Sequence, residues 1–158
     1  MFLTNCAAKQ VRKGSSLNTL ASQILQSYVE YYMYASKAGM IPFPKSLLIR
    51  IMDRLGEQEV DQLSEYIAKN DFKEMTLLLK NEYNLSTFLN MIESWLRVSE
   101  IGYRRDTIDD IQKFVIQHHM GKRWSRYFES LIKYAFKDLN QNEPVFEINN
   151  NSIAFRTT

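Results

Sequence analysis

Up to residue 98, apolar residues recur every three or four positions, which is the period of amphipathic helices. Gly14 and Gly56 fit the ends of such helices, because glycine adopts the left-handed conformation without steric penalty. Pro42 and Pro44 predict an extended link, since proline disfavours helical backbone in the residue before it. The pattern therefore predicts helices over residues 2–13, 17–38, 46–55, 57–69, 72–80 and 86–98.

After residue 98 the apolar period shortens, and β-branched and aromatic residues gather in short runs that favour strands. Asparagines 149–151 predict a hairpin turn, because asparagine tolerates positive φ. The expected elements are strands at 101–105, 111–118, 145–148 and 153–156, with a helix at 122–139. We therefore predict a predominantly helical α+β protein with about four antiparallel strands, in which short strands follow a helical first part. Its expected segments are a helix hairpin at 1–40, a helical segment at 41–98 and a small α+β unit at 99–158.

The composition narrows the class of protein further. The chain has 158 residues, 45% of them hydrophobic, which suits one domain or two small ones. No apolar run approaches the ~20 residues of a membrane-spanning helix, and the first residues lack a signal-peptide pattern. Cys6 is the only cysteine, so an internal disulfide and a multi-cysteine zinc site are excluded. We expect a cytoplasmic protein without a membrane partner.

Between Lys9 and Val29 a short helix, a glycine turn and a serine-capped second helix follow one another. The spacing Ser16-Leu17-x-x-Leu20-x-x-x-Ile24-Leu25-x-x-Tyr28-Val29 resembles the core of ribbon-helix-helix transcription regulators. Further motifs resemble a group of archaeal proteins with such an N-terminal module: Tyr31-Tyr32-x-Tyr34-Ala35-x-Lys37-x-Gly39, Pro42-x-Pro44 and His118-x-x-Gly121-x-x-Trp124-Ser125.

The resemblance implies a DNA-associated homodimer. Proteins of that family read bases in the major groove with a two-stranded ribbon that precedes the first helix. The present sequence begins inside the expected first helix, so either the strand lies upstream or the helical scaffold contacts only phosphates. Phosphate contacts position a protein on DNA without reading its sequence, and helix-start N–H groups favour them. The residues expected to make these contacts are Lys9, Arg12, Lys13 and Ser16.

The tyrosines of the expected helix 17–38 cover more than one of its faces, which favours burial both within the chain and against a second copy. The predicted dimer interface consists of Leu17, Leu20, Ile24, Tyr28, Tyr31 and Tyr32. An intramolecular core is the alternative explanation for these residues. A second functional hypothesis is a ligand-sensing or protein-interaction module that dimerises through residues 17–34 without binding DNA.

A second basic cluster follows Gly121, where a strand is expected to give way to a helix. Helix N-termini attract anions, so Gly121, Lys122, Arg123 and Arg126 form a candidate anion or ligand site. The spacing of a phosphate-binding loop is absent, so a plain glycine turn with solvated bases is the competing interpretation.

His118 and His119 are the strongest candidates for metal or acid–base chemistry. Neighbouring residues on a strand point to opposite faces, so both side chains cannot bind one ion from regular β geometry. We expect one histidine to be buried with a hydrogen bond and the other to be solvated. No acid, base and nucleophile cluster at a useful spacing, so we predict no enzyme activity, no cofactor and no metal.

Overall fold

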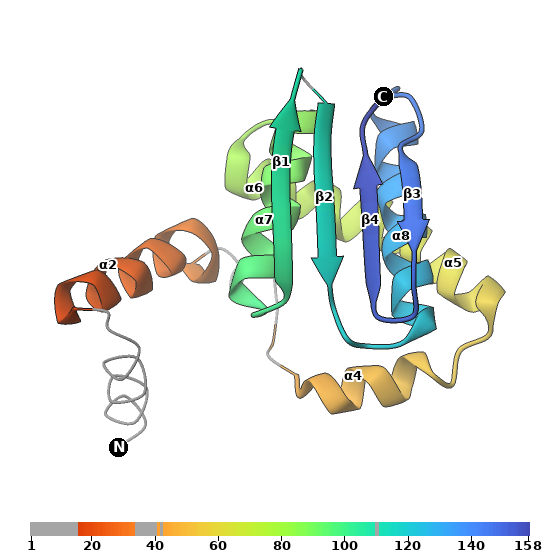
Figure 1. Ribbon diagram of the computed structural model, residues 1–158, viewed down its shortest axis with the longest axis horizontal. Helices are drawn as coiled ribbons and strands as arrows, with labels where there is room; N and C mark the ends of the chain where they lie inside the picture. Colours follow the sequence, from red (N-terminus) through yellow and green to blue (C-terminus); the bar gives the residue numbers. More distant parts are fainter. Residues whose placement is uncertain (1–15, 34–40, 42, 110) are drawn as a thin grey trace. The chain divides into compact units, whose positions relative to one another are not determined.

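The computed structural model describes residues 16–33, 41, 43–109 and 111–158, and it divides into two compact units, Met1–Met40 and Ile41–Thr158. In the first unit, helix α2 (Leu17–Ser27) continues into a π-helical turn, η1 (Tyr28–Tyr32) (Figure 1). The Ser16 side chain caps α2, because its Oγ accepts the backbone N–H of Thr19 at 3.1 Å. The expected helix 2–13 and residues 34–38 lie outside the described residues.

The second unit combines helices with one antiparallel sheet, as predicted. The strands lie in the order β1-β2-β4-β3, and every neighbouring pair is antiparallel. The helices are α4 (Lys45–Met52), α5 (Glu57–Ile67), the π turn η2 (Ala68–Phe72), α6 (Lys73–Lys80), α7 (Leu85–Val98) and α8 (Lys122–Asp138). The strands are β1 (Gly102–Ile108), β2 (Ile111–Gln117), β3 (Val145–Ile148) and β4 (Ser152–Arg156). No helix among the described residues is long and apolar enough to span a bilayer.

Helices α6, α7 and α8 cover one face of the sheet, and α4 runs along the end where β2 stops (Figure 1). The core lies between these layers. Phe114 of β2 and Phe155 of β4 stack with ring centroids 5.0 Å apart, and Phe88 of α7 meets Phe136 of α8 edge to face. Residues 41–98 and 99–158, which the sequence pattern separates, therefore share one compact unit. Helical spacing predicts one buried stripe on α8, and the structure confirms it: Trp124, Phe128, Leu131, Ile132, Ala135 and Phe136 are all buried.

Two details of the helical part differ from the sequence-based expectation. The chain does not break near residue 70: α5, η2 and α6 form one continuous helix, because no glycine or proline interrupts residues 57–80. The π turn η2 connects α5 to α6 without ending the helix, and it keeps Ala68 and Phe72 buried. In α4, the helical spacing of Leu47, Leu48, Ile51 and Met52 predicts that all four face inward. Leu47 and Ile51 are instead 40% and 52% exposed, because this helix meets the rest of its unit mainly through Met52.

Candidate functional site

The most unusual surface of the first unit is the outer side of α2 and η1. Six large apolar side chains there are at least half exposed: Leu17, Ile24, Leu25, Tyr28, Val29 and Tyr32. Folded monomers rarely leave so many apolar residues open along one short helix, so such a row indicates contact with another surface. We call these six residues the α2–η1 face.

The predicted dimer interface is only partly on this surface. Leu17, Ile24, Tyr28 and Tyr32 belong to the α2–η1 face, whereas Leu20 and Tyr31 are 9% and 5% exposed within the single chain. Burial raises the pKa of Tyr31 to about 12. The 3.6-residue period places all six side chains in one interface, but in the structure Leu20 and Tyr31 are buried in the single chain and the other four are exposed. Leu25 and Val29, which are not part of the predicted interface, also belong to the α2–η1 face.

The predicted phosphate contacts of this unit are mostly beyond what the structure describes. Lys9, Arg12 and Lys13 lie outside the described residues. Ser16 lies at the N-cap of α2, where its Oγ binds both the backbone N–H and the Oγ1 of Thr19, the latter at 2.8 Å. Ser16 therefore acts as the N-cap residue of α2.

In the second unit, the junction between β2 and α8 is held by a buried histidine. His118 is fully buried, and its Nδ1 accepts the backbone N–H of Met120 at 3.0 Å. The proton of the neutral ring must then be on Nε2, which donates to Ser125 Oγ at 2.9 Å. Ser125 in turn donates to the carbonyl oxygen of Asn149 in the β3–β4 turn.

This network is structural and does not resemble a nucleophilic site. Burial lowers the pKa of His118 to about 4, and the nearby charges of Lys45 and His119 act in the same direction. The imidazole donates to Ser125, whereas a general base would have to accept the serine proton. His119 is exposed, so the expectation of one buried and one solvated histidine is confirmed. Among the described residues, no three His, Cys, Asp or Glu side chains are grouped to hold a metal ion.

Gly121 begins α8 with φ at +90°, a conformation that L side chains rarely adopt. Its backbone N–H donates to Asn151 Oδ1 at 3.1 Å, which ties the junction to the β3–β4 turn. The glycine is therefore needed for the backbone path, whether or not a ligand binds.

Arg126 is engaged within the protein. Its guanidinium donates two hydrogen bonds to Asp61, at 2.9 and 2.6 Å, and a third to Glu57 at 2.8 Å. Ser130 Oγ adds a bond to Asp61 at 2.8 Å. The hydrogen bonds from Arg126 hold the pKa of the Asp61 carboxyl below its usual range. This network joins α5 to α8 and neutralises the arginine.

The four residues of the predicted anion site thus have different surroundings. Arg126 is paired with carboxylates, and Gly121 is held by the β3–β4 turn. Arg123 turns toward α4 and donates to the carbonyl oxygen of Asp53 at 2.8 Å, while Lys122 is exposed. Of the four, only the bases at positions 122 and 123 keep an uncompensated charge, and Arg123 is bonded to the C-cap residue of α4.

An open pocket of about 480 Å³ lies on the outer side of α8. Its lining is polar and of mixed charge: Asp61, Ser130, Lys133, Tyr134, Lys137, Gln141 and Glu143. Lys133 there is bound by Glu129 at 3.0 Å and Glu143 at 3.1 Å. With its charges largely paired, the pocket shows no preference for a charged ligand.

Comparison with protein-family models, with curated proteins and with solved structures gave no significant match. The function must therefore be argued from the residues of this chain.

Proposed function

We propose that the chain is a DNA-associated protein of the transcription-regulator type that works as a homodimer, with α2 and η1 at the contact between two copies. The observation that carries the proposal is the α2–η1 face, whose side chains are 50–69% exposed. Covering such a face stabilises the complex by roughly 25 cal/mol for each Å² of apolar surface removed from water.

A second copy of the same helix is the simplest cover for this face. A two-fold contact is made by one patch with itself, so it needs no other complementary surface on the chain. Tyr28 and Tyr32 suit such a contact, because tyrosine combines a large apolar area with a hydroxyl that remains wet at the rim. The dimer also doubles every DNA-contacting surface of the chain.

The DNA part of the proposal rests on the basic residues that precede α2. Lys9, Arg12 and Lys13 lie shortly before the Ser16 cap in sequence, and helix starts attract phosphate. Such contacts would hold the protein on duplex DNA without base reading.

Fluorescence anisotropy with a labelled duplex of mixed sequence tests this function. We expect binding at about 50 mM salt that weakens steeply toward about 200 mM, because phosphate contacts release counterions. Charge reversal of Arg12 and Lys13 to Glu should abolish it, while Lys80→Glu with Lys137→Glu, an equal change of charge elsewhere, should weaken it far less. Absence of binding at about 50 mM salt would reject the DNA-associated function.

The same face also supports a second candidate, a ligand-sensing or protein-interaction module that dimerises through residues 17–34. The two functions differ in one measurement. A chain that forms dimers in light scattering but binds no duplex at low salt fits the second candidate and contradicts the first.

A further inference from the structure

We infer that the chain has a second DNA-contacting surface, in the unit Ile41–Thr158, where α4 and residues 118–123 meet. Five basic side chains form this surface, which we call the basic end: Lys45, Arg50, Arg54, Lys122 and Arg123. Its ligand is the phosphate backbone of duplex DNA. The inference rests on the proposed function and adds to it a contact surface separate from the basic residues before α2.

The basic end differs from six other basic residues of the described chain in how its charge is balanced. Across the described part of the chain, many lysines and arginines form ion pairs with carboxylates: Lys69, Lys73, Arg104, Arg105, Arg126 and Lys133. No residue of the basic end forms such a pair with a described carboxylate. Asp53 is the only acidic residue within 43–55 and 118–123.

Two of these bases are held in place without being neutralised. Lys45 Nζ donates to the carbonyl oxygen of His118 at 2.6 Å, and Arg123 Nη1 donates to that of Asp53 at 2.8 Å. A carbonyl oxygen carries no net charge, so both cations keep theirs. The same bonds tie α4 to the β2–α8 junction and bring positions 45–54 and 122–123 into one surface.

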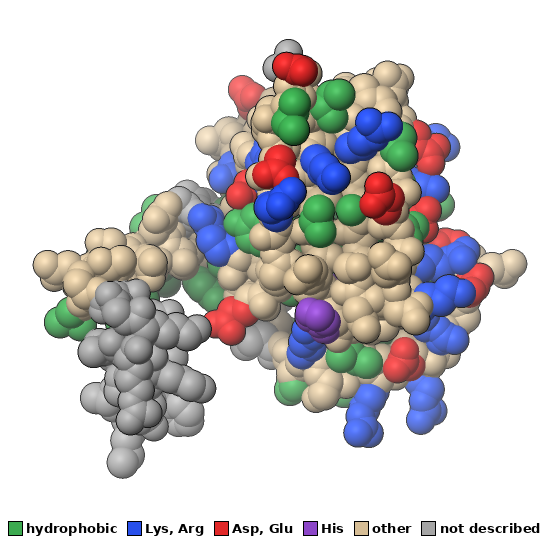
Figure 2. All heavy atoms as spheres, viewed as in Figure 1, with side chains coloured by type: hydrophobic (Ala, Val, Ile, Leu, Met, Phe, Trp, Pro, Cys, Tyr) green, Lys and Arg blue, Asp and Glu red, His purple; other side chains and the backbone are tan. Residues whose placement is uncertain are grey.

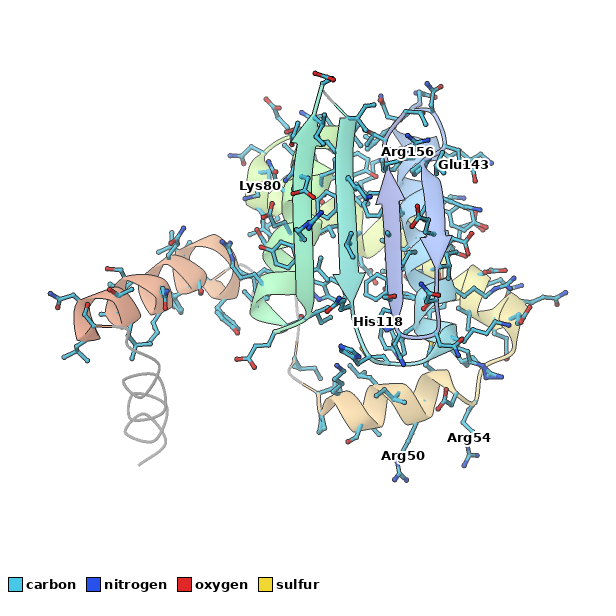
Figure 3. The ribbon with its side chains drawn as sticks, in the orientation of Figure 1. Arg50, Arg54, Lys80, His118, Glu143 and Arg156 are labelled. Atoms are coloured by element: carbon cyan, nitrogen blue, oxygen red, sulfur yellow. The ribbon has the colours of Figure 1, made fainter. Side chains whose placement is uncertain are left out.

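The remaining bases face outward. Arg50 lies in the last turn of α4 and Arg54 in the turn that follows the helix, and Figure 3 shows both side chains pointing away from the body of the unit. Lys122 is exposed at the start of α8, and blue side chains project from this end of the unit in Figure 2. Like charges that lie close together repel each other, and an external anion relieves that repulsion. Guanidinium groups suit phosphate because they donate two parallel hydrogen bonds to it.

An anionic membrane surface offers phosphates as well, and the chain also exposes Phe43 just before α4 and Leu47 and Ile51 within it. Insertion into a bilayer requires apolar side chains at the leading surface. Here Arg50 of α4 and Arg54 of the turn after it point outward (Figure 3). Lys122 and Arg123 add two more charges in the first turn of α8. This arrangement favours a polyanion that follows the charged surface, which is the geometry of a nucleic-acid backbone.

The test compares two full-length variants that remove the same charge. Arg50→Gln/Arg54→Gln/Lys122→Gln alters the basic end, and Lys80→Gln/Lys113→Gln/Lys137→Gln is the matched control. All three residues of the first set are exposed, as are Lys113 and Lys137 of the control, and Lys80 is half-buried at the last position of α6. Both variants should therefore give the circular dichroism and thermal unfolding of the wild type. With a labelled mixed-sequence duplex at about 50 mM salt, we expect the first variant to bind at least about tenfold more weakly. Its plot of log affinity against log salt should be shallower by about two to three, while the control stays near the wild type.

The outcomes separate this inference from the proposed function. If the wild type binds and the basic-end variant binds equally well, the inference is wrong and the proposed function stands. If Arg12→Gln/Lys13→Gln leaves binding unchanged while the basic-end variant loses it, the inference holds and the N-terminal contacts are wrong. If the wild type binds no duplex, both fail. A last measurement uses vesicles of phosphatidylserine and phosphatidylcholine. If the chain binds them more tightly than DNA, and Phe43→Ser/Ile51→Ser loses that binding, the ligand of the basic end is a lipid surface and the inference of DNA is wrong.

Discussion

His118 and Ser125 share a hydrogen bond of 2.9 Å between Nε2 and Oγ, and both side chains are fully buried. The bond joins the end of β2 to the first turn of α8, and the serine extends it to the β3–β4 turn through the carbonyl of Asn149. The backbone carbonyl of His118 holds Lys45 of α4. One buried pair therefore organises the junction on which the basic end is built.

Stability should fall as the solution is acidified through the range of this histidine. The pKa of His118 is about 4 in the folded chain, below its ordinary value of 6.5. The unfolded state therefore binds more protons between these values, so the contribution is complete above about pH 6.5 and is lost as the pH falls toward about 4. The difference of pKa corresponds to at most about 3 kcal/mol, and we expect about 2 kcal/mol because local opening admits water.

Urea unfolding between about pH 7.5 and 4.5 measures this loss. His118→Gln should reduce the free energy of unfolding at neutral pH and flatten its dependence on pH. His119→Gln, a change at the exposed neighbour, should leave the wild-type slope. An unchanged slope in His118→Gln would show that another group causes the acid sensitivity.

Replacing Ser125 by Ala should lower the free energy of unfolding by about 2 kcal/mol. The change leaves the Nε2–H of His118 and the carbonyl of Asn149 without their partner, and an unpaired buried polar group is costly. Ser99→Ala, at an exposed position after α7, is the control and should change stability very little. Equal stabilities of the two variants in urea would contradict a buried network.

Asp61 and Arg126 should show a coupling of about 1 kcal/mol in a double-mutant cycle made with Asp61→Asn and Arg126→Met. The Asp61 and Arg126 side chains are 32% and 37% exposed, so solvent screens their charges. Their bidentate hydrogen bonding nevertheless strengthens the ion pair. The coupling should shrink at high salt. Additive effects of the two substitutions would mean that the pair contributes nothing to the α5–α8 contact.

The α2–η1 face should control self-association. Ile24→Ser/Tyr28→Ser removes two half-exposed apolar side chains, and we expect the dissociation constant of the dimer to rise at least about tenfold. Ile108→Ser/Tyr66→Ser is a matched control, because these residues are 67% and 61% exposed on other elements. Light scattering across a concentration series measures the dissociation constant of each variant and of the wild type. A wild type that remains monomeric at micromolar concentration would reject the dimer.

Much of the fold was predictable because it depends on local patterns. The helical period of residues 122–139 marks the buried stripe of α8, and the asparagine turn marks the β3–β4 hairpin. Strand β1 is longer than expected, because the tight turn uses few residues and Asp106 pairs across the sheet with Lys113. The continuity of residues 57–80 was missed, since a π turn has no simple sequence signature.

The candidate site was less predictable, because the residues that surround a charge in the folded structure decide whether that charge is paired. Lys122, Arg123 and Arg126 are indistinguishable along the chain, yet only Arg126 lies opposite the carboxylates of α5. Lys45 belongs with positions 122–123 only because two hydrogen bonds across the fold bring them together. No spacing rule relates residues so far apart in sequence.

Periodicity, turn residues and composition by themselves determined the α+β class and the four antiparallel strands. They also determined that one of the two neighbouring histidines is buried and the other is solvated. Each depends on interactions between residues near in sequence. Tertiary packing alone decided that α4 turns Ile51 outward, that Leu20 and Tyr31 are enclosed, and which cations keep a free charge. Burial and electrostatic pairing depend on the elements that meet in space, and the local pattern of a chain does not encode that choice.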